Sequence, residues 1–317
     1  KEYGSILNVE KYDWNLLTRF VDCIDDGGQI SMETIGIDEN QKKLQQIIAI
    51  AKTMSDRYWV TCTNPPYLGG TGWNAKLDSF IKKNYDAAKT DLYSVFIDKC
   101  NKSTKVNGYQ AMITQHGWMF LSSFEKLRRI MLDESIFTNL VHLGPRAFDE
   151  INGEVVQSVA FVFKKKPQMS QYKGSYIRLV DLQSESEKER YYFDNTRKYA
   201  CSQDLYSELP GIPIAYWCSE NIVEVFKKAQ PLSKIAEPRQ GVKTLNNDLF
   251  LKLWFEVQSD SINYNCTSIE ESVESRKKWF PYNKGGTYRK WYGNNDYLVN
   301  WYNDGYDMKK LAVEKYK

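Results

Sequence analysis

The feature that most constrains this chain is a pair of prolines, Pro65 and Pro66, placed directly after a strand-like run. Residues 58–62 are mostly aromatic or β-branched, which favours an extended strand. Proline has no backbone N–H to donate to a neighbouring strand, so this strand must end before Pro65. We therefore expect residues 64–67, Asn-Pro-Pro-Tyr, to form a rigid loop at the tip of a strand.

Further strands and helices are predicted to alternate along the chain. Their order is helix 91–102, strand 111–114, helix 122–131 with Ser122 or Ser123 as its N-cap, and strand 136–143. Another apolar run, 155–163, follows too closely for a helical crossover and is expected to pair antiparallel with 136–143. The pattern predicts a Rossmann-like α/β sheet, mostly parallel with an antiparallel edge pair, and ligands bind beyond the carboxyl ends of such strands.

The side chains of the 64–67 loop suit chemistry on a planar amine. An exocyclic adenine amine is a poor nucleophile, and acceptors for its two hydrogens favour the tetrahedral form that attacks a sulfonium methyl. The Asn64 side-chain oxygen and the Pro65 carbonyl can accept those hydrogens, while Pro65 and Pro66 hold both acceptors in place. Tyr67 can stack on a base flipped out of a duplex. Similar loops also serve protein glutamine or guanine, so the substrate stays open at this point.

Length and composition limit the alternatives. A chain of 317 residues predicts one large domain and a smaller one, and Leu209–Pro213 carries the best boundary signal, so we expect domains at 1–210 and 211–317. The charged stretch 185–190 is expected to be a solvated face. No apolar run approaches a membrane span. Six cysteines without a CxxC pair and only two histidines predict no metal site and fit a reducing cytoplasm.

Longer motifs carry a specific resemblance. They are Thr63–Gly70, Lys89–Tyr93, Met112–Glu125, His142–Gly144, Ala147–Glu150, Gly153–Gln157, Ile214–Trp217 and Pro281–Gly286. Together they resemble the adenine-specific DNA methyltransferases of BREX phage-defence systems, the PglX group, over nearly the whole chain. The resemblance implies S-adenosyl-L-methionine (SAM) as the cofactor and double-stranded DNA as the substrate.

The resemblance also implies roles for individual residues. Phe148 is expected to stack on the face of the flipped base opposite Tyr67, whereas ordinary core packing is the alternative. The cofactor is expected to be bordered by Ser5, Ile6, Asn64 and Asp91. A Gly-rich SAM loop is expected ahead of Asn64, yet Gly27 and Gly28 lie in an acidic loop without the required strand and helix. We therefore expect the main SAM motif to lie outside this chain, and the chain alone to bind SAM weakly and to be inactive.

The last hundred residues suggest a DNA reader. Six basic and no acidic residues lie between 276 and 295, interleaved with six aromatic residues, and residues 239–247 resemble the start of a target-recognition domain. The predicted DNA contacts are Lys243, Lys284, Arg289 and Lys290. The alternative is a β-rich domain whose aromatic residues form its core and whose lysines are only solvated.

The leading hypothesis is a site-specific DNA adenine-N6 methyltransferase of a restriction-modification type of phage defence, with other BREX-system proteins as further partners. Two other classes stay open. One is a non-catalytic DNA-binding subunit of a defence complex, and the other is an amino-methyltransferase acting on RNA or protein glutamine.

Overall fold

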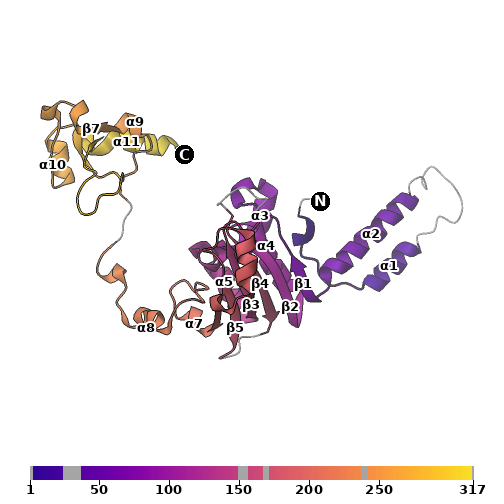
Figure 1. The fold of residues 1–317 in the computed structure, drawn as a ribbon. Coiled ribbons are helices and arrows are strands. Elements are labelled where there is room, and N and C mark those ends of the chain that lie inside the picture. Colours follow the sequence, from indigo (N-terminus) through magenta and orange to yellow (C-terminus); the bar gives the residue numbers. More distant parts are fainter. Residues whose placement is uncertain (1–2, 24–36, 149–155, 167–170, 238–240, 316–317) are drawn as a thin grey trace. The chain divides into compact units, whose positions relative to one another are not determined.

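The computed structural model describes residues 3–23, 37–148, 156–166, 171–237 and 241–315 (Figure 1). The chain divides into two compact units, Lys1–Gln230 and Pro231–Lys317. The junction expected near residue 210 therefore lies inside the first unit.

The first unit is built on a six-stranded sheet with the order β1-β2-β4-β3-β5-β6. The strands are β1 (Tyr58–Thr63), β2 (Thr104–Gln115), β3 (Ser135–Gly144), β4 (Ser158–Lys165), β5 (Lys173–Arg178) and β6 (Lys198–Ser202). The strands β1, β2, β3 and β5 run in one direction, and β4 and β6 run in the other. The predicted mixed α/β sheet, in which most strands run in one direction, is confirmed.

The position of β4 differs from the expectation. It pairs antiparallel with β3 as predicted, with Val141 opposite Ala160, but it also pairs with β2, where Ile113 lies opposite the same Ala160. The edge pair is instead β5 with β6. Because β4 runs antiparallel to β2 and β3, its amino end lies at the same end of the sheet as the carboxyl ends of β1, β2 and β3.

Helices connect and flank these strands. They are α1 (Trp14–Asp22), α2 (Ile37–Ser55), α3 (Ala75–Asn84), α4 (Leu92–Ser103), α5 (Glu125–Glu134), α6 (Glu185–Phe193), α7 (Asp204–Ser207) and α8 (Glu220–Lys228). The expected serine cap of α5 is wrong. Ser122–Phe124 forms a separate 3₁₀ turn, and Phe124, at the N-cap position, makes no side-chain hydrogen bond to the helix.

The main core lies between one face of the sheet and the helices α4 and α5. Ile97 of α4 and Leu127 of α5 are completely buried there with Trp118, Phe137 and Phe163. Each such side chain contributes roughly 1.5–3 kcal/mol by leaving water. This packing holds the ends of β1 and β2, and the loops that follow them, against a rigid layer.

A buried arginine explains why residues near 210 belong to the first unit. Arg128 of α5 donates to the carbonyls of Trp118 and Leu121, at 2.8 and 2.7 Å, and to that of Gly211 at 2.6 Å. Ile212 and the following apolar residues then enter the main core. Gly and Pro correctly mark an irregular segment here, but its side chains pack inward and so no boundary forms.

The charged stretch 185–190 is not simply solvated. It forms most of α6, and its Lys188 is only 3% exposed. The Lys188 ammonium donates to the carbonyls of Leu143, Leu179 and Leu182 at 2.7–2.8 Å. Three acceptors satisfy all three N–H groups, so this lysine ties α6 to the ends of β3 and β5.

The second unit contains a small antiparallel sheet in the order β7-β9-β8, with β7 (Leu251–Leu253), β8 (Trp279–Tyr282) and β9 (Tyr297–Asn300). Its helices are α9 (Asn247–Phe250), α10 (Ile269–Glu274) and α11 (Tyr302–Lys315). Its main core contains Phe250, Leu251, Phe280, Val299 and Met308.

Within the described ranges, no helix is long and apolar enough to cross a membrane. The same ranges hold no group of three or more His, Cys, Asp or Glu side chains placed to bind a metal ion.

Candidate active site

The Asn-Pro-Pro-Tyr loop lies at the tip of β1, as predicted. The strand ends at Thr63, and Asn64 follows as an exposed residue. Pro65 is buried, whereas Pro66 is exposed and the Tyr67 side chain is 37% exposed. The Tyr67 hydroxyl donates a long hydrogen bond, 3.4 Å, to Asn64 Oδ1. The loop is therefore anchored through Pro65, while the side chains of Asn64 and Tyr67 are exposed.

Asp91 fixes the far end of this loop. Its Oδ1 accepts hydrogen bonds from the backbone N–H of Leu68 at 3.1 Å and from that of Tyr93 at 3.2 Å. The second bond makes Asp91 the N-cap of α4. The Leu92 N–H donates to the Leu68 carbonyl at 3.0 Å, so the two segments are joined in both directions. The start of α4 thus sets the position of the residues after Tyr67.

The ring of Tyr67 is braced from one side. It meets the ring of Tyr93 edge to face, with 5.9 Å between centroids, and Tyr93 is 2% exposed. Partial burial, followed by the charge of Asp91, raises the pKa of the Tyr67 phenol. Tyr67 is therefore a neutral, supported aromatic surface at neutral pH.

A cavity of about 90 Å³ brings the predicted loop residues and Phe148 together. It is lined by Asn64, Tyr67, Arg146, Ala147, Phe148, Val156 and Ser158. Phe148 lies after the end of β3 and is 43% exposed, so it is not an ordinary core residue. The antiparallel direction of β4 explains this arrangement, since it places the start of β4 at the same end of the sheet as the loop.

Sequence reasoning gave no role to four residues of this cavity, among them Arg146 and Ser158. Arg146 has a φ of 53°, which is unusual for a residue with a side chain, and Ser158 begins β4 and is 3% exposed. The turn before them needs Gly144, whose φ is 71° and where an added Cβ would lie 2.7 Å from Val180 Cα. The Gly144-Pro145 pair was the available signal for a turn that redirects the chain over the loop.

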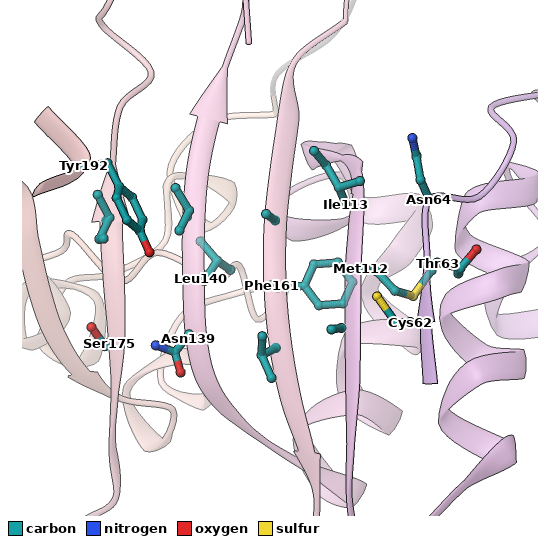
Figure 2. A pocket seen from close by; sticks show the side chains of 15 residues that line it. Cys62, Thr63, Asn64, Met112, Ile113, Asn139, Leu140, Phe161, Ser175 and Tyr192 are labelled. Atoms are coloured by element: carbon teal, nitrogen blue, oxygen red, sulfur yellow. The ribbon is translucent and has the colours of Figure 1, made fainter. Parts of the chain in front are cut away.

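A second cavity, of about 560 Å³, lies on one face of the sheet (Figure 2). Figure 2 shows that it extends from Cys62 and Thr63 on β1, and from Asn64 just after it, across β2, β4 and β3 to Ser175 on β5. Met112, Leu140 and Phe161 belong to the core under α4 and α5, so their neighbours Ile113, Val141, Ala160 and Val162 face the opposite side. The cavity is thus mainly apolar, and none of the residues that line it is charged.

The residues expected to border the cofactor are not all brought together. Asn64 lines both cavities described above, whereas neither lining includes Ser5, Ile6 or Asp91. Ile6 is 4% exposed and packs in the main core, and its carbonyl accepts a 2.5 Å hydrogen bond from the Tyr85 hydroxyl. Ser5 is exposed. Gly27, Gly28 and the motif residues 149–155 lie outside the described residues.

The two histidines of the chain lie in contact at the carboxyl ends of β2 and β3. His116 Nδ1 lies 2.7 Å from His142 Nε2, and His142 Nδ1 lies 3.2 Å from the Tyr216 hydroxyl. Burial, and then the nearby charges of His116, Arg178 and Lys188, lowers the pKa of His142 to about 3. Burial also lowers the pKa of His116. The pair is therefore neutral at pH 7 and links the carboxyl ends of β2 and β3 by hydrogen bonding.

The predicted DNA contacts lie in the second unit. Lys243 is exposed, and its neighbour Val242 accepts a 2.8 Å hydrogen bond from the hydroxyl of Tyr282 in β8. Lys284 lies two residues beyond Tyr282, with its ammonium 4.5 Å from the ring centroid of Tyr297. Arg289 and Lys290 are exposed in the loop between β8 and β9. Arg239 and Gln240 lie outside the described residues.

Comparisons with known proteins point in one direction. Residues 7–148 match the Eco57I restriction-modification methylase family. Adenine-specific methyltransferase PglX of Lacticaseibacillus casei (strain Zhang) is 40% identical over 96% of this chain, and BrxX of Escherichia coli O9:H4 (strain HS), with the same description, is 36% identical over 98%. The chain spans about a quarter of the length of these two relatives, 26% and 25%.

Among solved structures, a chain of a type I restriction-modification system resembles this one with a TM-score of 0.39 and 17% identity, covering 58% of this chain and 42% of its own. A methyltransferase subunit of a type I system from Streptococcus thermophilus gives a TM-score of 0.36 and 11% identity, with coverages of 64% and 58%.

Proposed function

The chain belongs to the PglX- and BrxX-like adenine-specific methyltransferases, and from this premise we propose that its 64–67 loop methylates the N6 amine of adenine in double-stranded DNA. SAM supplies the electrophilic methyl group when it is bound. The observation that carries the proposal is the shared cavity of Asn64, Tyr67 and Phe148 at the tip of β1.

The acceptors of the loop are available for the amine. Among the described residues, Asn64 Oδ1 receives only the 3.4 Å hydrogen bond from Tyr67, and no hydrogen bond is made to the Pro65 carbonyl. Both oxygens can therefore accept the two N6 hydrogens. As positive charge develops on N6 during methyl transfer, these hydrogen bonds strengthen and lower the barrier. Pro65 and Pro66 keep the two acceptors from reorienting.

Tyr67 and Phe148 are proposed to hold the flipped adenine between them. Both rings are partly exposed and line the same cavity, and Tyr93 supports the ring of Tyr67 from the side. An aromatic ring stacked on a base contributes about 1–3 kcal/mol, which offsets part of the cost of unstacking it.

The residues expected to border SAM fit it only in part. Asn64 is exposed at the rim of both cavities, but Ile6 is a core residue and Asp91 Oδ1 is already occupied by two backbone N–H groups. We therefore assign Asp91 the positioning of the loop as its first role.

At the level of the whole protein, we propose a role in bacterial phage defence, as the family resemblance implies. The second unit would bind DNA through Lys243, Lys284, Arg289 and Lys290, and other proteins of the defence system would be further partners.

The test uses a full-length protein that carries this segment, with the variants Asn64→Ala and Asn64→Asp. Alanine removes the acceptor, so the methyl-transfer rate onto unmethylated DNA should fall about 10²- to 10³-fold while the Kd for DNA stays within about twofold. Aspartate keeps an acceptor oxygen and should retain more activity than alanine. Parallel loss of binding and turnover would contradict the assigned role, and methyl transfer to RNA or protein instead of DNA would contradict the substrate.

A further inference from the structure

One loop of the second unit is built unlike the rest of that unit. Residues 283–296 connect the adjacent antiparallel strands β8 and β9 and contain neither helix nor strand. Connections between paired strands usually need two to five residues, and loops of more than about a dozen residues without secondary structure are commonly functional. A connection this long is not required to join β8 to β9.

The tip of this loop exposes three large aromatic side chains. Tyr288, Trp291 and Tyr292 are 87%, 89% and 85% exposed. By contrast, Trp279 and Phe280 in β8 are 9% and 7% exposed, so the aromatic residues needed for the core are already supplied there. The three tip residues present roughly 500 Å² of aromatic surface to water, an area comparable with the largest apolar patches of monomeric proteins, which are often functional.

The tip is held together from within. The Asn294 side-chain amide donates to the Thr287 carbonyl at 3.3 Å. An added Cβ on Gly286 would lie 2.9 Å from Asn294 Oδ1, so Gly286 permits this close approach. Gly293 has a φ of 148°, and an added Cβ there would lie 2.7 Å from Arg289 Cγ. The two sides of the loop are therefore in contact with each other below the exposed aromatic residues.

The charge around the aromatic residues indicates a polyanionic partner. Arg289 and Lys290 lie between Tyr288 and Trp291, and no acidic residue occurs from 276 to 295. The Lys290 ammonium lies 5.6 Å from the ring centroid of Trp291. A protein partner would normally be met by mixed charges around an apolar centre, whereas nucleic acid combines a uniformly negative backbone with flat bases.

We propose that the segment Tyr288–Tyr292 is a base-stacking element that binds DNA at unpaired or unstacked bases, with Arg289 and Lys290 on the flanking phosphates. This rests on the proposed DNA substrate, but it adds a binding site and a mode of recognition that the 64–67 loop does not need. The aromatic residues should then give a preference for disrupted over perfect duplex, and the basic residues should give salt-dependent affinity on any DNA.

The test measures the affinity of the 317-residue chain for two duplexes of identical sequence, one perfectly paired and one with a single unpaired adenine. The unmodified chain should bind the bulged duplex more tightly. Trp291→Ala should weaken binding to that duplex roughly 5- to 150-fold, remove the preference and leave the salt dependence unchanged. Trp291→Phe should restore most of the preference.

The controls separate stacking from charge and from folding. Tyr264→Ala and Tyr306→Ala remove aromatic residues of the same unit that are each 58% exposed, and they should change neither affinity. The pair Arg289→Gln and Lys290→Gln should weaken binding to both duplexes and lower the slope of log K against log salt by roughly 2. An unchanged melting temperature is expected for every variant, because the substituted side chains are exposed.

The outcomes distinguish this proposal from the proposed function. If Trp291→Ala binds each duplex with the same affinity as the unmodified chain does, the stacking site is wrong and the DNA substrate stands. If Trp291→Ala weakens binding to both duplexes by the same factor, stacking on unpaired bases is also wrong. If the unmodified chain binds neither duplex, DNA binding by this unit is wrong, and the stacking site falls with it.

Discussion

The two backbone hydrogen bonds that Asp91 accepts allow a quantitative prediction about how the active-site loop is held. Asp91→Ala removes the N-cap of α4, worth typically about 1 kcal/mol, and the acceptor of the Leu68 N–H, worth about another 1 kcal/mol. Unfolding free energy should fall by about 2 kcal/mol. For a unit of this size, that corresponds to a melting temperature lower by roughly 4–8 °C. Asp91→Asn keeps a capping acceptor and should lose less than about 0.5 kcal/mol.

The pH dependence of the same variants separates geometry from charge. Burial raises the pKa of Asp91 above that of an unfolded carboxyl group, about 3.9. The folded protein then holds this proton more firmly than the unfolded chain does. The pH-dependent part of Asp91's contribution to stability is therefore fully present below pH 4 and is lost as the pH rises through the folded pKa, while its accepted hydrogen bonds contribute at either pH. Relative to Asp91→Asn, the unmodified chain should gain stability as the pH falls from 7 to 4.

Differential scanning calorimetry of the 317-residue chain and its two variants, at several pH values, checks both expectations. The transition of the first unit should shift in Asp91→Ala and stay nearly in place in Asp91→Asn. Equal destabilisation by alanine and asparagine would refute the reasoning, because it would show that the negative charge, and not the accepted hydrogen bonds, holds the loop.

Other predictions follow from particular contacts. Gly144→Ala should lower the unfolding free energy by about 3 kcal/mol in denaturant titration, because its backbone is left-handed and its Cβ would meet Val180, whereas Gly285→Ala, with open space, should have little effect. Folding lowers the pKa of His142 to about 3, so NMR should find the His142 ring neutral at pH 5. The contribution of His142 to stability should be lost as the pH falls from 6.5 towards 3, and a charged ring at pH 5 would contradict its burial. In a full-length protein, Tyr67→Ala should reduce the 2-aminopurine fluorescence change on base extrusion and Tyr67→Phe should preserve it. Calorimetric titration of this chain with SAM should show no binding at micromolar concentration, because the cavity beside Asn64 has no charged lining residue, and tight binding would overturn this expectation.

Local rules were sufficient for much of the fold and for part of the site. The prolines after β1 placed the loop at a strand tip, and apolar spacing located β2, β3, β4 and the helices α4 and α5. The same rules failed where long-range packing decides. Ser122 and Ser123 have the right chemistry for a cap, but they lie in a separate turn, and the residues after Gly211 enter the core although Gly and Pro suggest a boundary.

The sequence by itself indicated which oxygens could accept hydrogen bonds from the proposed amine, because the Asn64 side chain and the Pro65 carbonyl are neighbours and the strand before them is a local feature. Only the tertiary structure decided what lies opposite them. Arg146 and Phe148 reach the cavity because they follow the carboxyl end of β3, and Ser158 reaches it because β4 runs antiparallel to β2 and β3. Strand direction and strand order depend on how whole strands pack, which local spacing does not reveal. Likewise, the sequence does not distinguish which aromatic residues from 279 to 292 are buried and which are exposed. The core of the second unit takes Trp279 and Phe280 and leaves Tyr288, Trp291 and Tyr292 in water, because only the residues of β8 can pack against the strand beside it.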